Sequence, residues 1–240
     1  MATDFILPDW RAPANVRALV TTRHGGISTA PYASFNLGDH VGDDPAAVAE
    51  NRRILRAHLP AEPVWMKQVH GIRCLDAARE MADADAAFSR STGVVCAVLT
   101  ADCLPVLLCD TDGTVVAAAH AGWRGLAAGI IESTVVAMDV PADQLMAWLG
   151  PAIGPQHFEV GGEVRDTFMA HDPQAASAFV AKPNGKWLCD IYLLARQRLE
   201  ALGVCRLAGA DYCTVRDAAR FFSYRRDGVT GRMASLIWLD

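Results

Sequence analysis

The chain has 240 residues, of which 52% are hydrophobic and 20% are charged, and its formal net charge at pH 7 is −5. This composition is typical of a globular protein with a sizeable core, and the length allows one large domain or two small ones. A net negative charge provides no general attraction to nucleic acid or to an anionic membrane, so neither is expected as a partner.

The amino-terminal residues MATDFILPDWRAP contain neither a basic segment nor a long apolar core, so no secretory signal is expected. No stretch approaches 18 uninterrupted apolar residues, which predicts the absence of a membrane-spanning helix. Reduced, buried thiols are typical of cysteines in or beside apolar runs, and five cysteines lie in such places: Cys74, Cys96, Cys109, Cys205 and Cys213. We therefore expect a cytoplasmic protein.

The amino-terminal half alternates short apolar runs with loops. A strand is predicted over residues 16–21, and a helix over 46–58 that begins after an Asp-Asp-Pro sequence. Residues 64–69 read as a strand that delivers His70 at its end, and residues 92–99 read as a buried strand.

The central stretch, residues 100–125, reads TADCLPVLLCDTDGTVVAAAHAGWRG. Two apolar runs separated by Asp-Thr-Asp-Gly predict a β-hairpin of residues 104–109 and 114–119. With a two-residue loop, Cys103 would face His120 across the open end, with Cβ atoms roughly 5 Å apart, and a bulge at Gly113 would shift this register by one residue. A glycine-rich turn then leads into a helix predicted over 126–138.

The carboxyl-terminal half continues the mixture. Strands are predicted over 145–149, 204–208 and 233–239, and helices over 160–169, 173–180 and 191–202. The aromatic and basic segment 221–228 is predicted to be a turn before the last strand, in which Arg225-Arg226 are expected to be solvated. Because strands and helices alternate along the whole length without a linker, residues 1–240 are expected to form a single α/β or α+β domain.

Three residues stand out as candidate catalytic and metal-binding groups: His70, Cys103 and His120. Two imidazoles and one thiolate form a known catalytic zinc set that leaves a fourth position open, where zinc would activate a water or polarise a substrate oxygen. A metal-free alternative uses Cys103 as nucleophile and His120 as base, with Asp102 or His70 orienting the base. Each residue taken alone is also compatible with ordinary core packing, and the sequence does not place His70 beside the other two.

Four further residues are candidates for supporting roles. Asp102 either accepts a hydrogen bond from a ligand imidazole or acts catalytically on a proton, or it is only a turn carboxylate. Arg124, beside two glycines at a predicted helix start, suits a phosphate or another oxyanion, and Arg23 beside Gly-Gly is a weaker anion candidate. In a strand, Gln68 would share a face with His70.

Several motifs in the same order resemble the YfiH family, also called the laccase-domain or multicopper polyphenol oxidase family. The matching segments extend over nearly the whole chain: TTRHGGIS, PYASFNLG, HVGDDP, NRR, KQVHG, ADADAAF, VLTADCLPVLL, HAGWRGLAAGI, LGPAIGP, FEVG and FFSYRRDGVTGRMASLIWL. Two positions depart from the family pattern. Gln156-His157 stand where the family often has cysteines, and Ala195-Arg196-Gln197 lack a common asparagine.

The resemblance implies a single-domain α/β/β/α layered sandwich of a cysteine-hydrolase-like type, with zinc on His70, Cys103 and His120. It further implies a purine nucleoside phosphorylase that cleaves adenosine, inosine, guanosine or 5′-methylthioadenosine with inorganic phosphate, with adenosine deaminase side activity. The protein would act as a monomer or weak homodimer. The older family name implies copper-dependent phenol oxidation, which fits poorly because a multicopper cluster needs many close imidazoles and the chain has seven histidines.

Two other functions stay open at this point. One is a zinc- or cysteine-dependent amide hydrolase that edits peptidoglycan precursors, a role that the family resemblance also implies. The other is a non-catalytic adaptor in which zinc only braces the fold; its fourth zinc position would be closed by protein.

Overall fold

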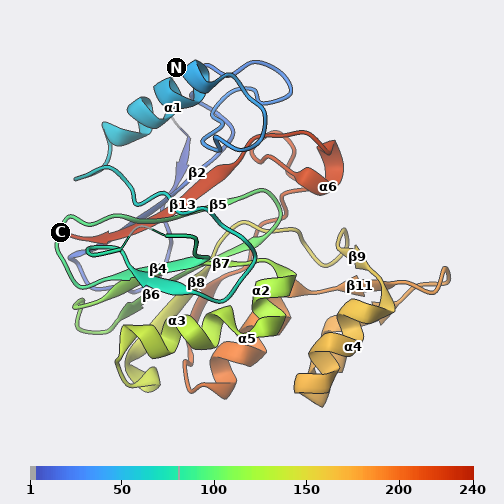
Figure 1. Ribbon diagram of the computed structural model, residues 1–240. Helices are drawn as coiled ribbons and strands as arrows, with labels where there is room; N and C mark the ends of the chain where they lie inside the picture. Colours follow the sequence, from blue (N-terminus) through green and yellow to red (C-terminus); the bar gives the residue numbers. More distant parts are fainter. Residues whose placement is uncertain (1–3, 81) are drawn as a thin grey trace.

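The computed structural model describes residues 4–80 and 82–240. The chain forms two main sheets that pack face to face, with helices on the outside (Figure 1). The four-stranded sheet has the spatial order β1 (Phe5–Ile6), β2 (Val16–Thr21), β13 (Met233–Leu239), β5 (Cys96–Thr100). The six-stranded sheet has the order β12 (Arg206–Gly209), β8 (Leu145–Leu149), β6 (Leu104–Asp110), β7 (Val116–Ala121), β4 (Ala86–Ser89), β3 (Cys74–Asp76).

The helices lie on the two outer faces. Helix α1 (Pro45–Arg56) covers the four-stranded sheet, whereas the six-stranded sheet is covered by α2 (Trp123–Ala128), α3 (Ile130–Met138) and α5 (Ile191–Ala201) (Figure 1). A small third sheet of β10 (Phe179–Ala181), β11 (Trp187–Cys189) and β9 (Glu159–Val160) projects to one side with α4 (Gly162–His171). The remaining helical segments are short: α6 (Tyr224–Asp227) and the 3₁₀ turns η1 (Ala142–Gln144) and η2 (Pro173–Ala178).

Strand β6 shows how the sequence produces these layers. Leu107 and Cys109 face the four-stranded sheet, and Val106 and Leu108, which alternate with them, pack against the helices on the opposite face. Because both faces of the strand are covered, its apolar run is continuous rather than alternating. The expected α/β/β/α layering is confirmed.

The central hairpin forms, but its register differs from the prediction. Pro105, rather than Cys103, lies opposite His120. The turn is longer than two residues because the buried Asp110 carboxylate accepts hydrogen bonds from the backbone N–H groups of Thr114 and Val115 and from the Thr114 hydroxyl. Cys103 therefore lies in the loop before β6.

Residues 64–69 were expected to form a strand and do not. This segment makes only isolated bridges, Val64 with Cys96 and Lys67 with Asp83. The Gln68 side-chain amide takes the place of a strand partner, since it donates to Leu99 O (2.8 Å) and accepts from Leu99 N (2.7 Å). An extended segment can thus lie at the end of β5 without continuing the sheet.

Three smaller expectations also need correction. The helix predicted over 126–138 begins earlier and is divided at Gly129, whose φ of 107° starts α3 in a new direction. The helix predicted over 173–180 is a 3₁₀ turn that runs into β10. Cys205 is exposed rather than buried, although all seven cysteines are free. In the described part of the chain, no helix has the length and apolar character needed to cross a membrane.

Candidate metal centre

Three segments that are distant in sequence deliver one thiol and two imidazoles to the same point. His70 follows the 64–69 segment, Cys103 precedes β6, and His120 belongs to β7. Their ligand atoms lie within 4.8 Å of one another, and Cys103 Sγ is 3.7 Å from His70 Nε2. The two imidazole rings pack edge to face, with centroids 4.7 Å apart. The structure therefore brings together the set that the sequence suggested.

A buried carboxylate, Asp85, organises two of these ligands. Its Oδ1 lies 2.8 Å from His120 Nδ1, which leaves Nε2 of that ring directed away from Asp85. The same carboxylate accepts hydrogen bonds from the backbone N–H groups of Val69, His70 and Gly71. It therefore also fixes the loop that carries the His70 imidazole. Burial alone raises the pKa of the Asp85 carboxyl. These hydrogen bonds outweigh burial and keep that pKa below its ordinary value.

Of the alternatives that the sequence leaves open for Asp102, its contacts favour that of a turn carboxylate. Its oxygens accept hydrogen bonds from Thr214 Oγ1 (2.5 Å) and from Arg225 N (2.6 Å), so the structure gives the imidazole-orienting role to Asp85 instead. Asp102 has a φ of 87°, a conformation that L-residues rarely adopt and that these two hydrogen bonds hold in place. Asp102 is therefore a turn carboxylate that positions the adjacent Cys103.

The charges in this group favour a thiolate. Burial raises the pKa of the Cys103 thiol, but His120 and His70 outweigh burial and bring that pKa down to about 6. Burial lowers the pKa of the His120 imidazole, while the neighbouring Cys103 and Asp85 raise it above its ordinary value. Near neutral pH, Cys103 thus carries the negative charge that a metal ligand or a nucleophile requires.

Two glycines allow α2 to begin directly against these ligands. A Cβ atom at Gly122 would lie 2.9 Å from both Cys103 Sγ and His70 Cδ2, and one at Gly125 would lie 3.0 Å from Gly71 O. The sequence HAGWRG therefore has its glycines where the backbone approaches the ligand group most closely.

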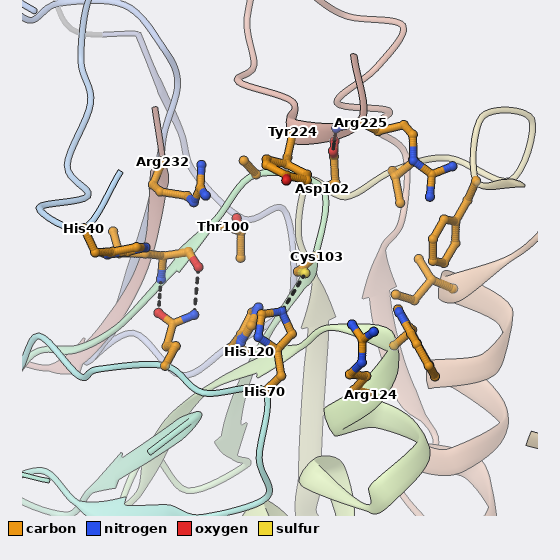
Figure 2. Close-up of a pocket in the computed structure, with 17 residues that line it drawn as sticks. His40, His70, Thr100, Asp102, Cys103, His120, Arg124, Tyr224, Arg225 and Arg232 are labelled. Carbon is orange, nitrogen blue, oxygen red and sulfur yellow. Dashed lines mark hydrogen bonds between the residues drawn. The ribbon is translucent and has the colours of Figure 1, made fainter. Parts of the chain in front are cut away.

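The ligand group lies in the wall of a cavity of about 480 Å³ (Figure 2). Besides the three ligands, its charged, polar and aromatic lining includes His40, Gln68, Thr100, Asp102, Trp123, Arg124, Phe158, Tyr224, Arg225 and Arg232. The sequence reasoning missed Asp85, His40, Tyr224, Arg225 and Arg232. All five lie in segments that match the family pattern: HVGDDP, ADADAAF and FFSYRRDGVTGRMASLIWL. Residue type and spacing alone do not distinguish them from ordinary surface or turn residues.

Of the three remaining predicted site residues, two line the cavity and one does not. Arg124 lines the cavity, and its guanidinium carbon lies 4.5 Å from the Trp123 ring centroid. Gln68 also lines it, with its amide engaged by the Leu99 backbone. Arg23 is not among the described residues that line the cavity, because it donates to Ala33 O and Ala218 O and packs over an aromatic ring.

Gln156-His157, at the position where the resemblance implied cysteines, also have a place in the structure. His157 Nδ1 lies 3.4 Å from the buried Cys213 Sγ, and neither residue lines the cavity. These two positions are therefore part of a neighbouring contact and not of the described cavity lining.

The donor set fits a single metal ion. Two imidazoles and a thiolate are ligands that Zn²⁺ prefers, and a three-residue set leaves a further position open, here toward the cavity. The Asp85 contact with His120 is the support that metal-bound histidines usually have. Within residues 4–80 and 82–240, this is the one group of three or more His, Cys, Asp or Glu side chains whose ligand atoms are this close.

Comparison with known proteins places the chain in a family. The model of the family described as multi-copper polyphenol oxidoreductase laccase matches residues 17–240. The chain belongs to this family. The protein PA4543 of Pseudomonas aeruginosa is 58% identical over 238 residues, and YfiH of Escherichia coli K12 is 55% identical over 239 residues. Each alignment covers 98% of both chains, and both relatives are named purine nucleoside phosphorylase.

Solved structures agree with this assignment. The Neisseria meningitidis protein NMB0706 is 53% identical, with a TM-score of 0.95 over 98% of this chain and 99% of its own. YlmD of Geobacillus stearothermophilus is 33% identical, with a TM-score of 0.87 over 94% and 92% of the two chains. The resemblance to the YfiH family and the α+β fold class are thereby confirmed.

Proposed function

We propose that this protein is a zinc-dependent purine nucleoside phosphorylase. It would cleave adenosine, and also inosine, guanosine and 5′-methylthioadenosine, with inorganic phosphate, and deaminate adenosine as a side activity. The observation that carries this proposal is the His70–Cys103–His120 group in the wall of a cavity of about 480 Å³, a volume typical of small-molecule sites. The names of relatives that are 58% and 55% identical support the same activity.

His70, Cys103 and His120 would hold the zinc ion, which when bound supplies a Lewis acid beside the nucleoside or phosphate. Asp85 fixes the His120 tautomer and the 69–71 loop, so the ligand atoms are set before the metal binds. A cationic side chain in the cavity lining would bind the phosphate and neutralise its charge as it approaches the ribose.

Copper oxidation is disfavoured by the ligands themselves. A multicopper cluster requires many imidazoles, and the described residues offer one three-ligand group. A single blue-copper centre uses the same His₂Cys set with a weak axial ligand, commonly methionine or glutamine. The described residues that line this cavity include no methionine, and the amide of Gln68 is engaged by the Leu99 backbone.

One observation favours a second candidate function. Cys103 Sγ, the two imidazoles and the Asp85 carboxylate form a thiol–imidazole–carboxylate arrangement that also suits a cysteine-dependent amide hydrolase. Such an enzyme would act without phosphate and, in its thiol form, without metal. A purely structural zinc is less compatible with a group that lines a cavity.

The proposal is tested by following adenine and hypoxanthine release from adenosine, with and without inorganic phosphate, together with zinc content. We expect adenine only when phosphate is present. Cys103→Ala should lose zinc and turnover together, more than about 100-fold in rate, because it removes the anionic ligand. Cys205→Ala, which changes an exposed thiol, is the matched control.

Three results would contradict the proposal. Full activity of Cys103→Ala would exclude the mechanism, and hypoxanthine formation without any phosphate-dependent adenine would make deamination the main reaction. If zinc-loaded, folded protein forms neither product, the purine assignment fails, and amide substrates become the next to test.

A further inference from the structure

The cavity has two chemically different sides. Figure 2 shows Arg232 and His40 on one side of Cys103, with Arg124 and Arg225 on the other side. The metal-binding group lies between them. A ligand that spans the cavity would therefore contact both sides and place its middle over the metal centre.

The side with Arg124 and Arg225 is aromatic and apolar. The Arg124 guanidinium carbon lies 4.5 Å from the Trp123 ring centroid, and that of Arg225 lies 5.5 Å from the Phe158 ring centroid. Arg225 also donates to Glu159 O. Ile153 and Ile191 also line the cavity. Flat aromatic and guanidinium surfaces beside aliphatic side chains suit a purine ring better than a small, strongly hydrated anion.

The opposite side contains an arginine that is held rigidly. The Arg232 N–H donates to Asn36 Oδ1 (2.9 Å), and its Nη1 donates to Thr230 O and Gly231 O (3.0 Å each). A Cβ atom on residue 38 would lie 2.8 Å from Arg232 Cγ, so the glycine at this position leaves room for the aliphatic part of the Arg232 side chain. Among the described residues, Nε and Nη2 of this guanidinium have no hydrogen-bond partner, which leaves two donors for an oxyanion.

The strand register explains why this arginine lies near the metal centre. Met233 of β13 pairs with Thr100 of β5, so Arg232 lies opposite the loop that leads to Cys103. The Thr100 side chain lines the cavity at the end of β5. The positive charge of Arg232 is close enough for the Cys103 and Asp102 charges to act on its pKa, which burial lowers.

We propose that Arg232 and Thr100 form the phosphate-binding side of this cavity, and that the purine binds against Trp123 and Phe158 on the opposite side. This inference rests on the proposed function and names the residues that would bind each of its two substrates, phosphate and the purine nucleoside. It assigns phosphate to Arg232 rather than to Arg124, which the sequence suggested. Both guanidinium groups have unengaged nitrogens among the described residues, but only that of Arg232 is fixed by backbone carbonyls, so that it presents preset donors to phosphate. The Arg124 guanidinium lies over the Trp123 ring, where it suits a planar base better.

The arrangement matches the atoms that must move. A phosphate oxygen forms a bond to ribose C1′ while the bond from C1′ to the purine nitrogen breaks, and its electron pair stays on that nitrogen. The proton of hydrogen phosphate ends on the purine, so adenosine and hydrogen phosphate give adenine and ribose 1-phosphate. This displacement requires phosphate and base on opposite sides of C1′, as the two sides of the cavity provide.

Steady-state kinetics of the zinc-loaded protein test this assignment. Arg232→Met should raise the KM for phosphate by about 10- to 100-fold and leave the KM for adenosine within about threefold, because it removes a charge-assisted contact to one substrate only. Thr100→Val should raise the phosphate KM more modestly, by about 5-fold. Arg124→Met, which changes an arginine on the other side, should raise the adenosine KM and spare the phosphate KM.

Direct binding of inorganic phosphate, measured by calorimetry, separates this inference from the proposed function. If wild-type protein binds phosphate and Arg232→Met does not, the assignment stands even when no nucleoside is cleaved. Melting temperatures and Arg232→Lys, which keeps a positive charge, establish that lost binding is not lost folding. Unchanged phosphate binding and KM in Arg232→Met, or loss of both in Arg124→Met, would overturn the assignment.

Discussion

Gly122 leaves no space for a side chain beside the metal ligands, since an added Cβ would lie 2.9 Å from Cys103 Sγ and from His70 Cδ2. We therefore predict that Gly122→Ala displaces these ligands, lowers zinc content and reduces turnover by at least about tenfold. Metal analysis and activity of the purified variant check this. Gly162→Ala is the control, because a Cβ there meets nothing within 4 Å. Zinc binding equal to that of wild type would show that the ligands can shift without cost.

Asp85 and Asp102 provide a second comparison between single residues. Asp85→Asn should weaken zinc binding by about 10- to 100-fold, because the carboxylate orients His120 and holds the neighbouring loop. Asp102→Asn should weaken it by less than about fivefold, because this carboxylate bonds Thr214 and Arg225 instead. Competition with a chelator gives both affinities. The reverse order would return the orienting role to Asp102.

The sequence indicated the three residues that we propose as metal ligands, but not the residues that support them. His70, Cys103 and His120 carry residue types whose chemistry is specific, so their local patterns were informative. Asp85 reaches His120 because β4 pairs with β7, with Ala86 opposite Ala119. Such a pairing between distant segments is a tertiary fact, and no local pattern encodes it.

At the scale of elements, the turn of the central hairpin is held by the Asp110 carboxylate. Burial raises the pKa of this carboxyl, but hydrogen bonds from Thr114 and Val115 outweigh burial and lower it. A lowered folded-state pKa contributes stability that is present above the unfolded value of about 3.9 and is lost as the pH falls through the folded value. Asp110→Asn should therefore cost about 1–2 kcal/mol of unfolding free energy at pH 7.

Urea unfolding between pH 3 and pH 7 checks this prediction, and the difference from wild type should shrink below about pH 4. Asp112→Asn removes a charge from an exposed residue of the same turn and serves as the control. A difference that stays constant with pH would show that the charge of Asp110 does not matter.

Elements with long apolar runs were the most predictable from sequence. Residues 16–21, 145–149 and 233–239 form strands with the predicted bounds. The last two are buried along their whole length, as expected for apolar strands that are covered on both faces. Residues 64–69 failed because the Gln68 side chain, rather than the backbone, satisfies Leu99. The prediction of one helix through residue 129 was wrong because Gly129, in a left-handed conformation, redirects the chain there.

At the scale of the whole molecule, the space between the two sheets is the shared core. Leu107 of β6 is fully buried in it, so Leu107→Ala should cost about 2–5 kcal/mol of unfolding free energy. Leu7→Ala, at a residue that is 72% exposed, should stay within about 0.5 kcal/mol of wild type. Urea unfolding followed by circular dichroism and by zinc release should give one coincident transition. Two separate transitions would contradict a single domain.

The position of β13 has a consequence for how the protein is made. This strand lies between β2 and β5, which do not pair with each other and are both synthesised long before it. Until residue 239 has left the ribosome, the nascent chain carries two strands with unpaired edges, which are prone to wrong association. The same late event brings Arg232 to the cavity. The pairing of β13 therefore covers the facing edges of β2 and β5 and completes the cavity lining in a single step.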